Sequence, residues 1–294
     1  AAKKQPESVE ENSEIKASPL VKNIARVKSI DLSRVSGTGP NRRIVKKDID
    51  AYLKGDTKQP PKKDKKTDIK TGTPDYTGLT SNQLAVARTV SESLRTIPTV
   101  SFKVKIDMQN IIQYREAHSK GNKGKISYDS ILIHEVVQTL NDFPKLCNTI
   151  LEGEYIENDE INLGLAIGVG TDLFTPVLKK TGEKSVRELS NEISLLAAKA
   201  NQQRLTLEEL NGGNFLFSNL GMYPVLEFNA IIPPGYGASL AVGAINDEAT
   251  VINKAVAIRP VCTLTLSTDH RIVNGREAAE FLQQLKYNLE ELKL

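Results

Sequence analysis

The chain has 294 residues, of which 39% are hydrophobic, and a formal net charge of +3, a size and composition that suit about two domains with at least one well-formed core. No apolar run approaches the roughly 18 residues of a membrane helix, no signal peptide is recognisable, and Cys147 and Cys262 have neither CxxC nor Cys/His ligand spacing. These features argue against a membrane protein, a disulfide-stapled secreted protein and a structural zinc site, and they predict buried thiols in a reducing compartment.

The positive charge is concentrated near the N-terminus. Residues 17–78 carry 15 Lys and Arg against 7 Asp and Glu, whereas residues 79–294 carry 21 against 25. This asymmetry indicates an acidic partner for the N-terminal region, whether a protein, a nucleic acid or an anionic surface. Nucleic acid is disfavoured, because no aromatic residues interleave the basic run 62–66 and no binding fold surrounds it.

The N-terminal part reads as a small helical domain between two linkers. Residues 1–16 are polar and acidic without apolar periodicity, so they form a linker and the chain is expected to be a fragment of a longer protein. Ser18–Pro19 is a helix start that opens a domain at residues 17–53, and a glycine-rich loop leads to a second helix at Ile44–Leu53. Residues 54–78, rich in Lys, Pro and Gly, form a second, extended linker.

The large region, residues 79–294, interleaves helices and strands without a strict βαβ repeat, which predicts an α/β sandwich with a mixed sheet. Helices are expected at Ser81–Arg95, Asp107–Ala117, Tyr128–Asn141, Val186–Gln203, from Thr206, and at Arg276–Leu294. Strands are expected at Thr99–Ile106, Asn162–Val169, Phe174–Leu178, Asn214–Phe217, Leu226–Ile232, Ala238–Ile245 and Val261–Ser267.

The last predicted strand leads to the most informative residue, His270. Asp269-His270-Arg271 follows the strand, and Asn274-Gly275 makes a turn before the final helix. A strand end is a place where a fold exposes a reactive side chain, although a packed structural histidine fits the local pattern equally well. The other histidines lie in predicted helices: His118 is expected at the surface near a helix end and is assigned no role, and His134 is assigned a structural one.

Ser218 ends another predicted strand, 52 residues before His270. The sequence contains no GxGxxG after a strand, no GxxxxGK[ST] loop, no HExxH and no GxSxG elbow. A histidine base and a serine hydroxyl are therefore the candidate chemical groups, with a backbone-capping hydroxyl as the structural alternative for Ser218.

Three blocks of the large region carry a family resemblance: 161–167 with 174–179, Gly213–Met222, and the DHRxxxG block at Asp269–Gly275. In this order they resemble the catalytic domain of the dihydrolipoamide acyltransferases of 2-oxo-acid dehydrogenase complexes, most of all the pyruvate-complex acetyltransferases. The resemblance implies a chloramphenicol-acetyltransferase-like sandwich with a mixed β-sheet and helices. It also implies transfer of an acetyl group between the lipoyl group of dihydrolipoamide and coenzyme A, with no metal.

In this resemblance His270 is the general base that deprotonates the attacking thiol, and the Ser218 hydroxyl stabilises the oxyanion. Asn274 replaces the commoner Asp of DHRxxDG. As an amide it can still hydrogen-bond the histidine, but a simple turn or N-cap residue is the alternative interpretation. No acyl-enzyme is required, so neither cysteine needs a role. The lipoyl domain of the family is expected upstream of Ala1.

The small domain resembles the peripheral subunit-binding domain of the same complexes, through the pattern at 18–26 and 35–49. The resemblance implies an all-α domain that binds dihydrolipoamide dehydrogenase, the 2-oxo-acid decarboxylase component, or both. Basic side chains of the first helix and the loop would pair with carboxylates of the partner, and the positions carried over are Lys22, Arg26 and Arg43.

The resemblance further implies trimers in which His270 and Ser218 meet across a subunit interface, assembled into a 24- or 60-subunit core. It places the protein in a bacterial cytoplasm or a mitochondrial matrix, without nucleic-acid or membrane partners. The competing hypothesis is a non-catalytic core component that only recruits dihydrolipoamide dehydrogenase. Retention of His270 favours the enzyme, since such components often lose it.

Overall fold

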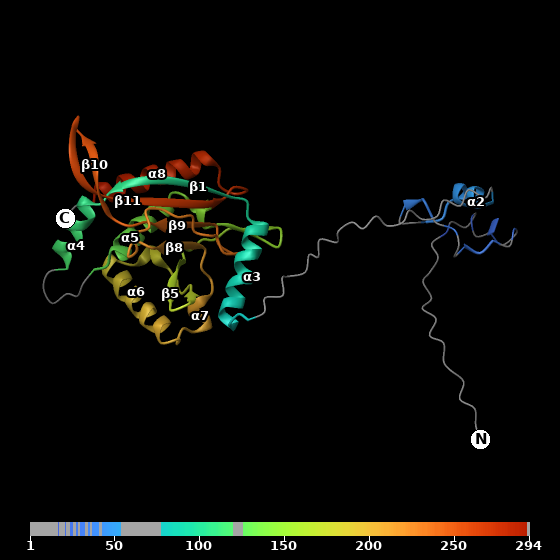
Figure 1. Ribbon diagram of the computed structural model, residues 1–294, viewed down its shortest axis with the longest axis horizontal. Coiled ribbons are helices and arrows are strands. Elements are labelled where there is room, and N and C mark those ends of the chain that lie inside the picture. Colours follow the sequence, from blue (N-terminus) through green and yellow to red (C-terminus); the bar gives the residue numbers. More distant parts are fainter. Residues whose placement is uncertain are drawn as a thin grey trace, which may run out of the picture. The chain divides into compact units, whose positions relative to one another are not determined.

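The computed structural model describes residues 17, 21, 24, 25, 28, 30–32, 35, 37–40, 43–53, 78–119 and 126–292. The chain divides between residues 73 and 74 into two units (Figure 1). The predicted linker 1–16, nearly all of the linker 54–78 and the helix start Ser18–Pro19 lie outside the described residues.

The small unit contains the second predicted helix, α2 (Lys46–Leu53). The helix begins two residues later than predicted, because Ile44 is in extended conformation and forms a parallel bridge with Ala17. Among the described residues of the small unit, Val21, Val35, Ile44 and Ile49 are buried together. A domain this small is marginally stable, so its polar contacts count.

Asp48 ties the loop of the small unit to α2. Its carboxylate accepts hydrogen bonds from the Thr38 amide (2.9 Å), the Thr38 hydroxyl (2.6 Å) and the Val45 amide (2.9 Å). Burial by itself would raise the pKa of Asp48, but the hydrogen bonds from Thr38 and Val45 outweigh it and the pKa is lowered. Asp48 therefore stabilises the unit above the unfolded-state pKa of about 3.9. This contribution is lost as the pH falls through the lower pKa of the folded state.

Replacing Asp48 by alanine is expected to destabilise the small unit by about 3 kcal/mol, because three donors lose a charged acceptor. For so small a unit, this is enough to unfold it. Amide hydrogen exchange of residues 43–53 in the whole chain would measure the change, with residues 126–292 as the internal reference. Unchanged protection of α2 would contradict the role given to Asp48.

The large unit is built on a seven-stranded sheet in the order β1-β11-β9-β8-β4-β7, and β10 pairs with the first part of β11. Its strands are β1 (Thr99–Asp107), β4 (Leu163–Leu165), β7 (Val177–Leu178), β8 (Phe215–Asn219), β9 (Ala238–Val242), β10 (Asn246–Ile252) and β11 (Ala255–Asp269). β8 runs parallel to β4 and β9, and the other pairs are antiparallel. The sheet is mixed, as predicted.

Two small hairpins stand apart from this sheet. They are β2 (Thr149–Leu151) with β3 (Glu154–Ile156), and β5 (Ile167–Val169) with β6 (Asp172–Phe174). The two long strands predicted at 162–169 and 174–178 are thus each divided, into β4 and β5 and into β6 and β7.

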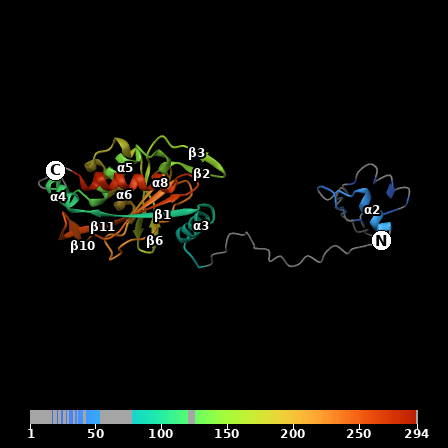
Figure 2. The ribbon, with the colours of Figure 1, turned by 90° about the horizontal axis from the view of Figure 1, so that it is seen from above.

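Helices cover one face of the sheet, with α5, α6 and α8 lying together over it (Figure 2). The helices of the large unit are α3 (Ser81–Thr96), α4 (Gln109–His118), α5 (Tyr128–Leu140), α6 (Val186–Asn201), α7 (Leu207–Leu210) and α8 (Gly275–Glu290), with 3-10 turns at Pro144–Cys147 and Thr181–Glu183. The last predicted helix is confirmed as α8, and its apolar stripe is buried: Ala278, Leu282, Leu285 and Leu289. The core lies between this helical layer and the sheet.

The opposite face of the sheet is crossed by the segment 223–236, where a strand at 226–232 was predicted. That prediction is wrong, because the segment joins no ladder. It is held by single bonds, for example from the Ser239 hydroxyl to the Ala230 carbonyl (2.9 Å) and from the Ser93 hydroxyl to the Ile232 carbonyl (2.6 Å). The segment therefore covers the sheet without extending it.

Candidate active site

β11 delivers His270 to the surface at one end of the sheet. The strand pairs with β1 as far as Asp269, opposite Thr99, and the chain then turns away. Asp269 is 2% exposed, whereas His270 is exposed and its amide donates to the Pro98 carbonyl (3.0 Å). The predicted strand-end placement of His270 is confirmed.

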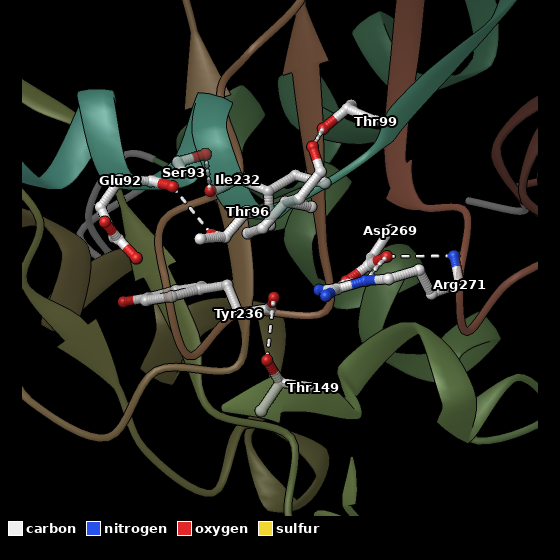
Figure 3. A network of polar contacts seen from close by, with 10 residues as sticks. Glu92, Ser93, Thr96, Thr99, Thr149, Ile232, Tyr236, Asp269 and Arg271 are labelled. Atoms are coloured by element: carbon white, nitrogen blue, oxygen red, sulfur yellow. Dashed lines mark hydrogen bonds and ion pairs between the residues drawn. The ribbon is translucent and has the colours of Figure 1, made fainter. Parts of the chain in front are cut away.

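The turn that carries His270 is held by Asp269 and Arg271 (Figure 3). The Asp269 carboxylate accepts from the Arg271 amide (3.0 Å), from its Nε (2.9 Å) and from its Nη2 (2.5 Å). The hydrogen bonds that Arg271 donates to the Asp269 carboxylate raise the pKa of Arg271. The Asp269 carbonyl also accepts from the Ile272 and Val273 amides, both at 3.0 Å. The turn that carries His270 is thus stabilised by hydrogen bonds to both the carboxylate and the carbonyl of Asp269.

The imidazole of His270 is oriented by a backbone carbonyl. Its Nδ1 lies 3.0 Å from the Val273 oxygen, and because a carbonyl can only accept, Nδ1 must carry the proton. In the neutral imidazole the second nitrogen, Nε2, is then unprotonated and has a free lone pair. This is the tautomer that a general base needs.

Asn274 is the N-cap of α8. Its side-chain oxygen accepts from the Glu277 amide at 3.0 Å. Within one chain, Asn274 therefore acts as a helix-capping residue, which was the alternative interpretation of this position. In the described part of the chain the imidazole of His270 bonds to Val273, so a role for Asn274 in supporting the base stays a prediction.

Ser218 lies in β8, the strand between β9 and β4. Phe215 and Phe217 point into the core, so the alternation of the strand turns Ser218 to the opposite face, where it is half-buried. The hydroxyl therefore lies on the face that the helices do not cover.

One chain does not bring Ser218 and His270 together. Ser218 is in register with Ala241 of β9, which is in register with Thr265 of β11, so the serine is two strands away from β11 and five residues short of His270. At about 4.8 Å per strand and about 3.3 Å per residue, the two Cα atoms are roughly 19 Å apart. A site that uses both residues needs a second copy of the chain.

The two cysteine thiols, for which no role was predicted, are confirmed as buried. Burial raises the pKa of both the Cys147 and the Cys262 thiol to about 12. Neither thiol is ionised near neutral pH, so neither serves as a nucleophile. The described residues contain no group of three or more potential metal ligands, and no described helix is long and apolar enough to span a bilayer.

A cavity of about 580 Å³ opens on the helical side of the sheet, where β8 ends. Its wall includes Asp129, Asn219, Gly221 and Met222. Asn219 directly follows Ser218, and its amide contacts Asp129. Neither residue was predicted from the sequence to be functional. Asp129 is an acidic residue in the first turn of α5, and nothing in its local sequence indicates that Asn219 contacts it.

In the small unit, Arg43 follows a tight loop. The Gly39 amide donates to the Arg43 carbonyl (3.0 Å), and the Arg43 amide donates to the Pro40 carbonyl (3.2 Å). The Arg43 side chain is exposed. The other two predicted partner-binding residues, Lys22 and Arg26, lie outside the described residues.

The large unit is a mixed α/β sandwich that presents an exposed histidine at the end of β11. The catalytic domain of the 2-oxoacid dehydrogenases acyltransferases matches residues 73–294, and the e3 binding domain matches residues 15–50. The chain belongs to the 2-oxoacid dehydrogenase acyltransferase family.

A curated relative is the dihydrolipoyllysine-residue acetyltransferase component of the pyruvate dehydrogenase complex of Rickettsia typhi, 32% identical over 284 residues, or 95% of this chain and 68% of the relative. Three solved structures align with a TM-score of 0.70. A probable dihydrolipoamide acetyltransferase of Listeria monocytogenes is 32% identical, and the alignment covers 75% of this chain and 95% of that one.

The second structure is the cubic core of a pyruvate dehydrogenase multienzyme complex, 25% identical, with 76% of this chain and 94% of that one covered. The third is Azotobacter vinelandii dihydrolipoamide acetyltransferase, 24% identical with the same coverage. That structure was determined to investigate the role of a serine, a histidine and an asparagine in the catalytic mechanism of the Azotobacter vinelandii protein. These likenesses confirm the predicted fold.

Proposed function

We propose that this chain is the acetyltransferase core of a pyruvate dehydrogenase complex and moves an acetyl group between dihydrolipoamide and coenzyme A. The observation that carries the proposal is His270, an exposed imidazole held with Nε2 unprotonated, in a chain of this acyltransferase family. Relatives named as the pyruvate-complex component support the choice of acyl group.

The chemistry follows from two placed groups. Nε2 of His270 takes the proton of the attacking thiol, and the thiolate adds to the thioester carbonyl. The tetrahedral oxyanion accepts a hydrogen bond from the Ser218 hydroxyl. Collapse of the intermediate breaks the old carbon–sulfur bond, and the leaving thiolate recovers the proton from the imidazolium. The enzyme ends unchanged, and no acyl-enzyme forms.

Residue spacing supports these roles independently of overall similarity. The serine, histidine and asparagine named for the Azotobacter vinelandii protein follow one another at intervals of 52 and 4 residues. Ser218, His270 and Asn274 have the same residue types and the same intervals. We assign general-base catalysis to His270 and oxyanion stabilisation to Ser218, and to Asn274 a contact near the base made in the assembled protein.

The proposed site requires self-association, and the hairpin of β10 and β11 offers a surface for it. Val251, Val256 and Ile258 are 74–75% exposed, and the strand register places them on one face. They continue the core side of β11 beyond the end of the helical layer. The hairpin begins at the Ser218 end of the sheet, where a second copy must bring its His270. We propose a trimer as the unit, built into a core of 24 or 60 subunits, as the cubic core of a relative suggests.

For residues 17–53 we propose binding of dihydrolipoamide dehydrogenase, of the decarboxylase component, or of both, through Lys22, Arg26 and Arg43. The match to an e3 binding domain and the exposed Arg43 support this. We further propose linkers at 1–16 and 54–78, a catalytic domain at 79–294, and a place in a bacterial cytoplasm or a mitochondrial matrix. The relatives that support this place include a bacterial protein and one named mitochondrial.

Arg43→Glu is expected to weaken capture of dihydrolipoamide dehydrogenase by about tenfold or more, since reversal replaces an attraction by a repulsion. Surface plasmon resonance with the whole chain would measure it, and Arg276→Glu, which changes an exposed charge of the large unit, is the matched control. Equal binding by both variants would contradict the assignment of Arg43.

The proposed function is tested by incubating the assembled protein with acetyl-CoA and free dihydrolipoamide. Acetyl-dihydrolipoamide and free coenzyme A are expected products. An assembled protein without turnover would favour a non-catalytic core component that only recruits the dehydrogenase. Parallel reactions with propionyl- and succinyl-CoA would show whether the acyl group is assigned correctly.

A further inference from the structure

The side chain of Asn219 holds the backbone that immediately follows Ser218 through two hydrogen bonds. The Asn219 oxygen accepts from the Gly221 amide at 2.7 Å, which closes a turn at the end of β8. Its Nδ2 donates to Oδ1 of Asp129 at 2.5 Å. One amide thus bonds on one side to its own strand end and on the other to a helix residue 90 positions earlier.

Asp129 is well placed to act as an anchor. It lies in the first turn of α5, whose N-cap is Ser127, and Ile131 and Leu132 next to it are buried in the core. The positive end of the helix dipole favours a carboxylate at this position. Because α5 packs against both α6 and α8, the carboxylate is fixed to the helical layer and not to a mobile loop.

The backbone after Ser218 has little room to move on its other sides. A Cβ on Gly221 would lie 2.9 Å from the Gly243 carbonyl oxygen, and a Cβ on Gly243 would lie 2.0 Å from that of Leu226. The Leu220 amide donates to the Val242 carbonyl at 3.0 Å. Residues 226 and 242–243 of the same chain therefore restrict movement of the end of β8 on one side. The Asn219–Asp129 hydrogen bond restricts it on the side of the helices.

We propose that Asp129 and Asn219 are positioning residues that hold the end of β8, and with it the Ser218 hydroxyl, in the place where the oxyanion forms. The inference rests on the proposed function, because it gives Ser218 the role of oxyanion donor. Asp129 and Asn219 point to the face of the sheet opposite Ser218. They act through the backbone of one strand and do not touch the substrate.

A displacement of a catalytic group by about 1 Å can cost about 10²-fold in rate. Partial loosening of the strand end by Asp129→Ala is therefore expected to lower kcat by about 10-fold and to leave KM within about twofold. Asp129→Asn keeps an oxygen that can accept from Asn219 and is expected to recover most of the kcat. Asn288→Ala is the matched control, since it removes a side-chain bond to Thr139 at the other end of α5.

The deciding test is a double-mutant cycle of Asp129→Ala and Ser218→Ala in the assembled protein, with circular dichroism and sedimentation confirming fold and assembly. If Asp129 acts through Ser218, the kcat of the double variant equals that of Ser218→Ala alone. Multiplying losses, or a loss of kcat in Asn288→Ala equal to that in Asp129→Ala, would overturn the inference and leave the proposed function intact. An unaffected Ser218→Ala would overturn the role of Ser218 and the inference together.

Discussion

Replacing His270 by alanine is expected to lower kcat for acetyl transfer by about 10²- to 10⁴-fold, because the attacking thiol loses its base. KM for both thiol substrates should change little, since the imidazole takes part in the proton transfer and not in binding the acyl carrier. The residual rate should rise with pH above neutrality, as the thiol ionises without help.

His134→Ala is the matched control for that measurement. His134 lies in α5, and its Nδ1 contacts the Glu135 carboxylate at 2.9 Å. It is far in sequence from the DHR turn, and its loss should leave kcat unchanged. A His270→Ala protein that assembles normally and keeps more than about a third of the wild-type kcat would rule out His270 as the base.

Replacing Ser218 by alanine is expected to lower kcat by about 10²- to 10³-fold, the usual cost of removing one oxyanion donor. The effect should fall on kcat because the donor bonds to charge that exists only in the transition state. Steady-state kinetics with acetyl-CoA and dihydrolipoamide would separate kcat from KM. A rise in KM with kcat preserved would mean that Ser218 binds substrate and does not stabilise the oxyanion.

The elements that carry the site follow from local sequence patterns. The second half of β11 alternates apolar and polar residues, so it was predicted at Val261–Ser267, whereas the strand itself begins at Ala255. α8 has a regular apolar stripe behind an Asn N-cap, so its start was predicted to within one residue. The capping boxes of Thr80 with Gln83, Ser185 with Glu188 and Thr206 with Glu209 fix three further helix starts. Such signals are readable because they depend on neighbours within four residues.

Other parts depend on contacts that the sequence does not encode locally. Residues 226–232 have the composition of a strand, but Val225 and Ala230 use their carbonyls for isolated bonds to β9 and its end, so no ladder forms. The β10–β11 hairpin, with its bare apolar face, and the link from Asn219 to Asp129 were not predicted either. Each depends on a partner many residues away or on a second copy of the chain.

The cover over the apolar face of α3 also depends on distant contacts. Leu84, Ala87 and Val90 share one face of the helix and are half-buried, whereas Leu94 is 69% exposed. A helix pattern indicates an apolar face but not what covers it. Leu94 and the β10–β11 hairpin are exposed within one chain, and both fit an assembled protein better than an isolated subunit.

We propose that one chain supplies His270 and another supplies Ser218 to the same site. Complementation tests it directly: the inactive variants His270→Ala and Ser218→Ala are dissociated, mixed in equal amounts, reassembled and assayed. In a closed ring that mixes at random, one site in four pairs an intact serine with an intact histidine, so about a quarter of the wild-type activity is expected. Activity no higher than the average of the two variants reassembled separately would contradict a site that is shared between two chains.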